Sequence, residues 1–366
     1  MGLDEGPVTA GGKGARAMRT GLAEATGTAA ALLVAATAVA AAEAPAAIVS
    51  SGFVFERAPF RSAHASTIVE TRDGLLAAWF GGTEEGHADV GIWVPRNDGA
   101  GWSPPIEVAN GLQSDGTRHP CWNPVLFQPS RGPLLLFYKV GPSPREWWGL
   151  ARTSADQGRS WSDTIRLPAG ILGPIRAKPV ELAGGEVLAG SSTEHAGWVV
   201  RMERWTGGDL ASAAAWQKSG PLNDPGEFGA IQPTILAHSP SLLQVLCRSR
   251  QGVVTEAWSE DAGLTWGRMA ATALPNPNAG IDALRLSDGR TLLVYNPTKS
   301  GRDRLEIAVS ADGKTWGRAV VLEDSPGEYS YPAMIQARDG RVHVSYTWRR
   351  ERIRHVVVDP ARIQPR

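Results

Sequence analysis

The segment SADQGRSW at residues 154–161 recurs as SEDAGLTW at residues 259–266 and, one residue shorter, as SADGKTW at residues 310–316. In each copy, Ser and Asp side chains can accept hydrogen bonds from the backbone N–H groups of a tight turn. Gly supplies the positive φ that such a turn requires. The closing Trp is expected to bury its ring beneath the loop. We therefore predict three structural turns, whose recurrence indicates a repeat architecture.

Six hairpins follow the same period. Each consists of an apolar strand, a polar or glycine-containing turn and a second apolar strand, which is the pattern of a β-hairpin. A tryptophan follows five of them, at spacings of 59, 55, 50 and 50 residues. The hairpins span residues 67–82, 125–141, 179–194, 233–249, 283–298 and 333–348, and the tryptophans are Trp102, Trp161, Trp216, Trp266 and Trp316.

Six hairpins, each followed by two further short strands, predict an all-β fold, a six-bladed β-propeller over roughly residues 52–360. The sixth hairpin is followed only by RIRHVVV at residues 352–358. We therefore expect an N-terminal strand at Gly52–Glu56 to complete the last blade and close the ring. Residues 46–366 are accordingly predicted to form a single domain.

The composition excludes several functional classes. The chain has 366 residues, with 37 Lys and Arg balanced by 37 Asp and Glu, and it has no strongly basic block. Nucleic acid and stable membrane insertion are therefore poor predictions. Cys121 and Cys247 could form a bridge, but two buried thiols are the favoured interpretation. No clustered metal-ligand motif occurs, so neither a metal nor a cofactor is expected.

The N-terminal segment has the layout of a secretory signal. Lys13, Arg16 and Arg19 precede the Ala-rich apolar run at residues 28–42, and small residues follow near Glu43. This arrangement predicts export to the periplasm or the extracellular space, with residues 1–45 outside the folded domain. A disordered Ala-rich tail is the alternative interpretation.

The first strand of each blade should line the central channel, where side chains two residues apart share a face. Aligning the six hairpins gives polar pairs at equivalent positions, and four pairs are followed by proline, which suits the start of an inner strand. A merely solvated tunnel is one interpretation, and a site for an anionic sugar is the other. The pairs are His64 and Ser66, Cys121 and Asn123, Arg176 and Lys178, Ala230 and Gln232, Gly280 and Asp282, and Tyr329 and Tyr331.

The three turn motifs resemble the Asp box, or BNR repeat, of the sialidase (neuraminidase) superfamily. The resemblance covers nearly all of the chain after the N-terminal segment. It implies a carboxylate-binding set of three arginines, a tyrosine nucleophile paired with a glutamate, and an acidic residue as acid/base. Tyr329, in GEYSYPAM, is similar to the family's nucleophile. Arg248 and Arg302 resemble its second and third arginines, with Arg304 as an alternative, because arginine binds a carboxylate in a bidentate manner.

The loop GGTEEGHAD at residues 81–89 supplies the acid/base candidates implied by the resemblance, Glu85 and Asp89, with Glu85 preferred. The sequence departs from the family at two positions. His64 rather than Arg61 occupies the slot of the first arginine. Gln232 occupies the place of the glutamate, and it can orient a phenol but cannot take its proton.

Three functions compete. The first is a secreted exo-acting glycosidase of sialidase type that removes a terminal acidic sugar, with Arg61 or Arg176 completing the carboxylate site. The second is a uronate-specific lyase, in which a histidine (His64, His119 or His195) and Tyr329 or Tyr331 act as acid and base. The third is a non-catalytic glycan-binding propeller. Further candidates for substrate binding are Lys178, Asn123, Gln232, Asp282 and Tyr331.

Overall fold

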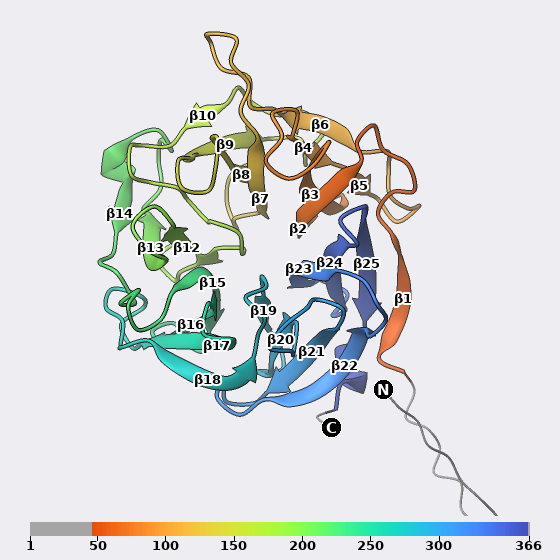
Figure 1. The fold of residues 1–366 in the computed structure, drawn as a ribbon, viewed down its shortest axis with the longest axis vertical. Coiled ribbons are helices and arrows are strands. Elements are labelled where there is room, and N and C mark those ends of the chain that lie inside the picture. Colours follow the sequence, from red (N-terminus) through yellow and green to blue (C-terminus); the bar gives the residue numbers. More distant parts are fainter. Residues whose placement is uncertain (1–45, 365–366) are drawn as a thin grey trace, which may run out of the picture. The chain divides into compact units, whose positions relative to one another are not determined.

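The computed structural model describes residues 46–364, so the predicted signal segment lies outside the described residues. Six antiparallel sheets are arranged in a ring around a central axis, which confirms the predicted six-bladed propeller (Figure 1). Blade 1 also contains the short strand β5 (Arg96–Asn97), which pairs with β3. Strands are given from the centre of the ring outward. Blade 1 consists of β2 (Ser62–Thr71), β3 (Gly74–Gly82), β4 (Gly91–Val94) and β6 (Ile106–Ala109), and blade 2 of β7 (Cys121–Phe127), β8 (Leu134–Val140), β9 (Trp148–Ser154) and β10 (Ile165–Arg166). Blade 3 consists of β11 (Val180–Glu181), β12 (Val187–Thr193), β13 (Val199–Trp205) and β14 (Trp216–Lys218).

Blades 4 to 6 repeat this order, and the last blade takes its outer strand from the N-terminal side of the chain. Blade 4 consists of β15 (Ala230–Ala237), β16 (Leu243–Ser249), β17 (Val253–Ser259) and β18 (Ala270–Pro275). Blade 5 consists of β19 (Asp282–Arg285), β20 (Thr291–Tyr295), β21 (Leu305–Ser310) and β22 (Gly317–Glu323). Blade 6 consists of β23 (Tyr329–Gln336), β24 (Val342–Trp348), β25 (Arg352–Val358) and β1 (Ile48–Phe53). The described helical segments are the 3₁₀ turns η1 (Ala213–Ala215) and η2 (Pro360–Arg362). No helix within residues 46–364 is long and apolar enough to cross a membrane.

The N-terminal strand closes the ring, as the sequence predicts. Strand β1 pairs antiparallel with β25, with Ile48 opposite Val358 and Phe53 opposite Arg354. The strand begins four residues before the expected Gly52. Because β1 and β25 come from opposite ends of the domain, their pairing joins the first and last parts of the repeat array.

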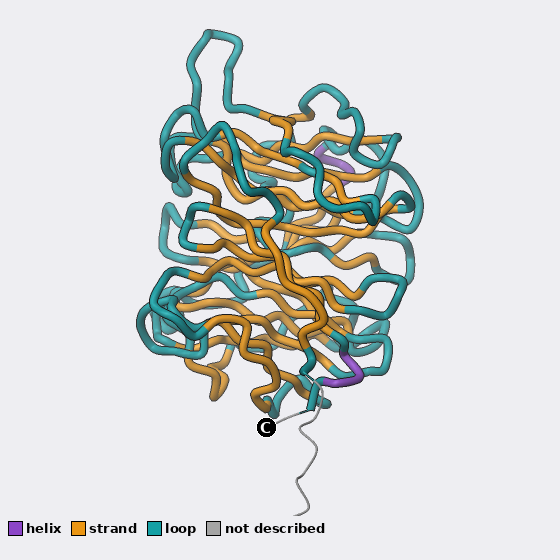
Figure 2. Tube along the Cα trace, turned by 90° about the vertical axis from the view of Figure 1, so that its right-hand side faces the viewer, coloured by secondary structure: helices purple, strands orange, loops and turns teal. Residues whose placement is uncertain are grey.

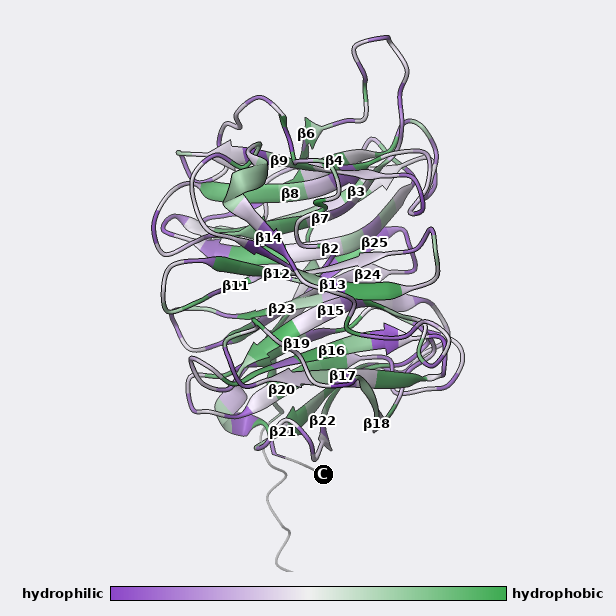
Figure 3. Ribbon diagram, turned by 90° about the vertical axis from the view of Figure 1, so that its left-hand side faces the viewer, coloured by the Kyte–Doolittle hydropathy of each residue, from purple (hydrophilic) through white to green (hydrophobic). Residues whose placement is uncertain are grey.

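The hydrophobic core is divided among the six junctions between neighbouring blades. Each junction holds its own cluster of buried side chains, so the apolar face of every sheet packs against the next sheet. In Figure 3 the strands carry most of the hydrophobic colour and the connecting loops most of the hydrophilic colour. Cys121 and Cys247 are both free and buried, in agreement with the favoured interpretation of the sequence.

The three Asp-box turns connect the third and fourth strands of blades 2, 4 and 5. In the first, Asp156 accepts hydrogen bonds from the backbone N–H groups of Arg159 and Ser160, at 3.0 and 2.8 Å. Gly158, at φ 81°, approaches blade 1 so closely that a Cβ there would lie 2.2 Å from Leu76. Gly263 and Gly313 repeat this positive φ and this contact with the preceding blade. The Asp boxes therefore link blades as well as closing turns.

The tryptophans that end these turns are less buried than the sequence analysis expected. Trp161, Trp266 and Trp316 are half-buried and pack against the edges of three of the core clusters. Their rings cover the junctions between blades rather than lying inside them. In the strand order, these turns and the hairpin turns lie at one end of the blades, and the loops between second and third strands lie at the other (Figure 2).

Four inner strands contain a β-bulge at the position that faces the channel. The register shifts in β2, β7, β15 and β23, and the bulged residue has positive φ in each case. A bulge inserts an extra residue, so side chains two apart no longer share a face. The predicted channel pairs are therefore not equivalent side chains in these four blades. The residues at positive φ are Ala65 (57°), Asn123 (40°), Gln232 (57°) and Tyr331 (50°).

Candidate functional site

Tyr331 lies at the centre of a cluster of cations at the mouth of the channel. Its phenol oxygen accepts a hydrogen bond from Arg248 Nη1 at 2.7 Å. The guanidinium carbons of Arg176, Arg248 and Arg302 lie 5.3, 5.4 and 5.7 Å from the centre of the Tyr331 ring. The bulge in β23 turns this residue toward the channel, so side chains from blades 3, 4, 5 and 6 meet at one aromatic ring.

Blade 5 provides both space and support for this cluster. A Cβ on Gly280 would lie 3.2–3.3 Å from three atoms of the Tyr331 ring, so the absence of a side chain there lets the ring lie against the backbone. The backbone oxygen of Asn278, a residue at φ 58°, accepts from Arg248 Nη1 at 3.3 Å and from Arg302 Nη2 at 3.4 Å. One carbonyl therefore positions two arginines from different blades, Arg248 on β16 and Arg302 on the loop between β20 and β21.

A second group of charges borders the cluster. Glu328 accepts hydrogen bonds from Arg302 Nη1 at 3.1 Å and from Arg350 Nε at 3.0 Å. Burial raises the pKa of Glu328, but its bonds to Arg350 and the nearby charge of Arg302 outweigh this effect, so the pKa is lowered overall. Arg350 also bonds to Glu85. The predicted acid/base candidate Glu85 is thus exposed and linked to the site through an ion pair with Arg350.

His64 is a buried, neutral imidazole against the same tyrosine. Its ring centre lies 4.3 Å from that of Tyr331, and neither ring nitrogen has a hydrogen-bond partner within the described residues. Burial lowers the pKa of His64 well below its usual value, and the charge of Arg350 lowers it further, followed by those of the other three arginines. His64 is therefore uncharged at neutral pH, and neither ring nitrogen is engaged by another group among the described residues.

A polar layer lies on the inner strands below the cluster. Arg176 is buried and donates to the backbone oxygens of Ile281, at 2.6 Å, and of Pro332. Burial lowers the pKa of Arg176 to about 10. Asp282 accepts from Lys178 Nζ at 2.8 Å and from Thr234 Oγ1 at 2.8 Å. Lys178 and Asp282 therefore neutralise each other and tie blades 3, 4 and 5 together.

Tyr329 lies elsewhere, contrary to the expectation that it shares a face with Tyr331. It is buried in the core between blades 5 and 6, with its ring centre 6.4 Å from that of Trp348. A Cβ on Gly327 would lie 2.7 Å from the Tyr329 hydroxyl, so this phenol is enclosed by backbone. The bulge at Ser330–Ala333 is the physical reason, because it separates the directions of the two tyrosines.

The remaining predicted residues lie around the site or outside it. Arg61 lines a separate pocket of about 510 Å³ on blade 1, together with Asp89. Asp89 accepts from Thr83 and His87, and these interactions outweigh burial and lower its pKa to about 2, so it is ionised at neutral pH. Gln232 and Asn123 are buried at the bulges of β15 and β7, and Gln232 Oε1 has no partner within residues 46–364.

Arg350 and Glu328 belong to the site although no pattern in the sequence indicates them. Arg350 follows the second strand of blade 6, in the same kind of loop that carries Arg302 in blade 5, and Glu328 directly precedes β23. Within residues 46–364, Arg176 and Arg248 form no ion pair with a carboxylate, whereas Arg302 and Arg350 share Glu328. The site can therefore accept an anion at Arg248 and place it beside a phenol and a neutral imidazole. No cluster of metal ligands occurs among the described residues.

Comparisons with known proteins agree with this fold. The family described as a BNR repeat-like domain matches residues 73–344. A protein of unknown function from Dyadobacter fermentans superposes with a TM-score of 0.70 at 17% identity, covering 85% of this chain and 98% of that chain. The Hadza microbial sialidase Hz136 gives 0.68 at 17% identity, covering 83% and 66%. The NanB sialidase from Streptococcus pneumoniae gives 0.68 at 11% identity, covering 86% and 71%. No curated protein sequence matches the chain.

Proposed function

The chain belongs to the BNR repeat-like domain family, and we propose that it is a glycosidase of sialidase type that removes a terminal acidic sugar from a glycan. The observation that carries the proposal is the convergence of Arg248, Arg302 and Tyr331 at the channel mouth. The sialidases with similar folds support it at the level of the fold. We also propose export of the protein, which rests on the N-terminal sequence.

Carboxylate recognition is the first step of this proposal. Among residues 46–364, Arg248 donates hydrogen bonds through Nη1 alone, to a phenol and a backbone carbonyl. A sugar carboxylate is the partner that matches the guanidinium fork, because two parallel charge-assisted hydrogen bonds form with one planar group. Arg302 lies on the other side of the shared Asn278 carbonyl, so the same carboxylate can be held between two guanidinium groups.

Tyr331 then replaces Tyr329 as the proposed nucleophile. Its oxygen attacks the anomeric carbon, the bond to the leaving-group oxygen breaks, and an acidic side chain protonates that oxygen. Water subsequently cleaves the glycosyl-tyrosine bond. The Tyr331 proton passes to a water molecule as the new bond forms, and the Arg248 N–H donor at 2.7 Å stabilises the negative charge that develops on the phenol oxygen. Asp89 is a poor proton donor in this scheme, since it is already ionised at neutral pH.

Covalent trapping tests this proposal directly. The purified protein should release sialic acid from an activated α-sialoside. A fluorinated sialic acid analogue should leave an adduct on Tyr331 that peptide mass spectrometry locates. Turnover with an adduct on a different residue would remove Tyr331 from the nucleophile's role. Tight binding of acidic glycans without any turnover would instead support the non-catalytic propeller and reject the glycosidase.

A uronate lyase is the second candidate, because one observation favours it. His64 is neutral, buried and unpartnered in both ring nitrogens within the described residues, and it faces Tyr331. In this reaction an arginine neutralises the uronate carboxylate and His64 removes the proton on the adjacent carbon. Tyr331 protonates the departing oxygen, and a carbon–carbon double bond forms.

Product analysis separates the two reactions. A lyase acting on a uronate-ended oligosaccharide yields an unsaturated product that absorbs in the ultraviolet, and a hydrolase yields none. His64→Ala should abolish lyase turnover as completely as Tyr331→Phe does. In a glycosidase, His64→Ala should still permit trapping of the Tyr331 adduct.

A further inference from the structure

A pocket of about 580 Å³ lies between blades 2 and 3, outside the cation cluster at the channel mouth. Its walls come from the loop joining β8 to β9, the segment between β10 and β11, the end of β12 and the outer strand β14. The loop joining β8 to β9 and the end of β12 face the same rim as the loops that carry Arg302 and Arg350. We call it the side pocket.

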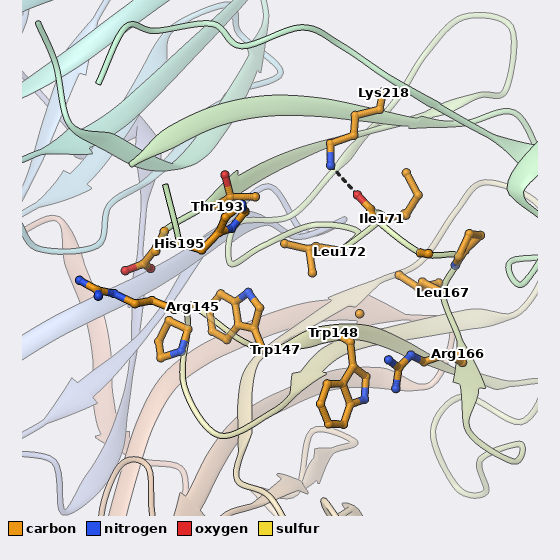
Figure 4. A pocket seen from close by; sticks show the side chains of 16 residues that line it. Arg145, Trp147, Trp148, Arg166, Leu167, Ile171, Leu172, Thr193, His195 and Lys218 are labelled. Carbon is orange, nitrogen blue, oxygen red and sulfur yellow. Dashed lines mark hydrogen bonds between the residues drawn. The ribbon is translucent and has the colours of Figure 1, made fainter. Parts of the chain in front are cut away.

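Two tryptophans form one wall of the side pocket (Figure 4). Trp147 and Trp148 are both half-buried, and the Arg166 guanidinium carbon lies 4.4 Å from the centre of the Trp148 ring. The aliphatic side chains of Leu167 and Leu172 also line the pocket. The opening carries polar groups in addition: Arg145, Thr193, Glu194, His195 and Lys218.

Two chains of side-chain contacts link the side pocket to the cation cluster. Trp147 meets Trp122 edge to face, with ring centres 6.0 Å apart, and Trp122 meets Phe80 in the same way at 6.1 Å. Phe80 in turn lies 5.4 Å from His64. On the other route, Arg248 lies 5.2 Å from the ring centre of Trp198, and its charge acts on Glu194 at the edge of the pocket.

We propose that the side pocket binds the neutral sugar unit next to the acidic sugar held at the channel mouth, an assignment that rests on the proposed function. An indole wall and aliphatic side chains match the apolar face of a pyranose ring, and polar groups at the opening match its hydroxyls. The volume lies within the usual range for a small-molecule site.

The lining holds three cations and one carboxylate, and each cation already lies near another group of the protein. Arg145 lies near Glu194, whose pKa is raised by burial and partly lowered by the Arg145 charge. Lys218 donates to the Gly170 carbonyl and lies 3.7 Å from the carboxylate of Glu203, so its charge is already balanced. Arg166 is stacked on Trp148. Glu194 is the acidic member of the lining, and a carboxylate on the ligand would lie against it.

Ligand binding without turnover is the first test, because it does not depend on the reaction. Saturation-transfer NMR with lactose as the probe should show contact with the wild-type protein. The signal should be lost in Trp147→Ala, and also in Ala169→Trp, which fills the pocket from its rim without deleting a wall. Trp258→Ala, a half-buried tryptophan on blade 4, is the matched control and should leave the signal intact.

Kinetics supplies the second test. If the wild type hydrolyses sialosides, Trp147→Ala should raise KM for sialyllactose about tenfold or more. It should change kcat/KM for methyl α-sialoside by less than about twofold. Equal effects on the two substrates, or no lactose signal from the wild type, would overturn the side-pocket assignment. Lactose binding by a protein that turns over no acidic glycoside would reject the proposed function and leave the pocket as a neutral-sugar site.

Discussion

The structure places Tyr331 rather than Tyr329 in the cation cluster, and replacing each tyrosine in turn by phenylalanine tests this placement. Tyr331→Phe removes the phenol that accepts from Arg248 at 2.7 Å, whereas Tyr329→Phe removes one enclosed in the core. If Tyr331 is the nucleophile, its variant should lose about 10³-fold or more in kcat, which corresponds to about 4 kcal/mol in the transition state. Tyr329→Phe should retain nearly all of the activity.

The structural contribution of the Tyr331 hydroxyl is small by comparison. A hydrogen bond to a charged group is worth roughly 1.5–3 kcal/mol. Arg248 keeps its contact with the Asn278 carbonyl and its place near the Trp198 ring, so the folding loss in Tyr331→Phe should lie at or below that range. Binding of a product-like acidic sugar should weaken by no more than about tenfold.

The assay combines initial rates on an activated sialoside with chemical denaturation and titration of the free acidic sugar. The wild type, Tyr331→Phe and Tyr329→Phe are measured side by side. A Tyr331→Phe variant with near wild-type kcat would refute the placement of the reacting oxygen. A Tyr329→Phe variant that folds normally but loses turnover would show that the bulge in β23 does not orient the two residues as described.

Four further outcomes are expected. Lys139 is fully buried, and burial lowers its pKa from 10.5 to about 7. Between these pH values the unfolded chain binds the Lys139 proton and the folded chain does not, so the free energy of unfolding should rise with pH by up to about 1.4 kcal/mol per pH unit. Denaturant titrations should show that Lys139→Met loses this pH dependence. Trp266→Ala should destabilise by only about 1–3 kcal/mol, because the ring is half-buried, and a larger loss would place it inside the core. Burial raises the pKa of Glu194 despite nearby arginines; Glu194→Gln should therefore slow substrates with poor leaving groups more than activated ones, and equal slowing would exclude proton donation. Glu328→Gln should raise KM for acidic substrates, because Arg302 and Arg350 lose the shared carboxylate that fixes their orientation. An unchanged KM would show that these two ion pairs are not needed for substrate binding.

The fold could be predicted from the sequence because its signals are local and repeated. The Asp-box motif, with its Ser, Asp and Gly at fixed positions, specifies one turn by hydrogen bonds that span only a few residues. Apolar hairpins at a period of about fifty residues leave few architectures other than a ring of blades. The absence of an Asp box after the sixth hairpin correctly indicated that the last blade needs an outside strand, and β1 supplies it.

The site was less predictable because bulges interrupt the two-residue period on which the alignment relied. A proline follows the bulged residue in β7, β15 and β23, at Pro124, Pro233 and Pro332. The sequence analysis interpreted these prolines as strand starts. A proline has no N–H for the ladder, and a bulge is a second place where its absence is tolerated. Interpreted as a sign of a bulge, the proline after Tyr331 would have predicted that Tyr331 and Tyr329 lie on different faces of the strand.

Arg350 and Glu328 were missed for a different reason. Glu328 contacts Arg302 and Arg350, 26 and 22 residues away, and no repeated motif marks any of these positions. Glu85 comes from blade 1, nearly the whole chain away from Arg350, and the two meet only because the ring closes. Contacts of this kind have no short-range sequence pattern, so local spacing cannot reveal them.

Tyr331 shares its positive φ with the bulged residues of three other inner strands, and its surroundings support this conformation. A bulky residue at φ 50° lies in a sparsely populated region of backbone conformation, which costs on the order of 1–3 kcal/mol. The Tyr331 ring is itself buried, and it packs against the core cluster between blades 1 and 2. The surroundings offset the strain, since Gly280 leaves room for the ring, Arg248 bonds the hydroxyl and three guanidinium groups lie near its ring. They hold one phenol in a fixed orientation at the channel mouth before any ligand arrives, which is what an attacking or proton-transferring oxygen requires.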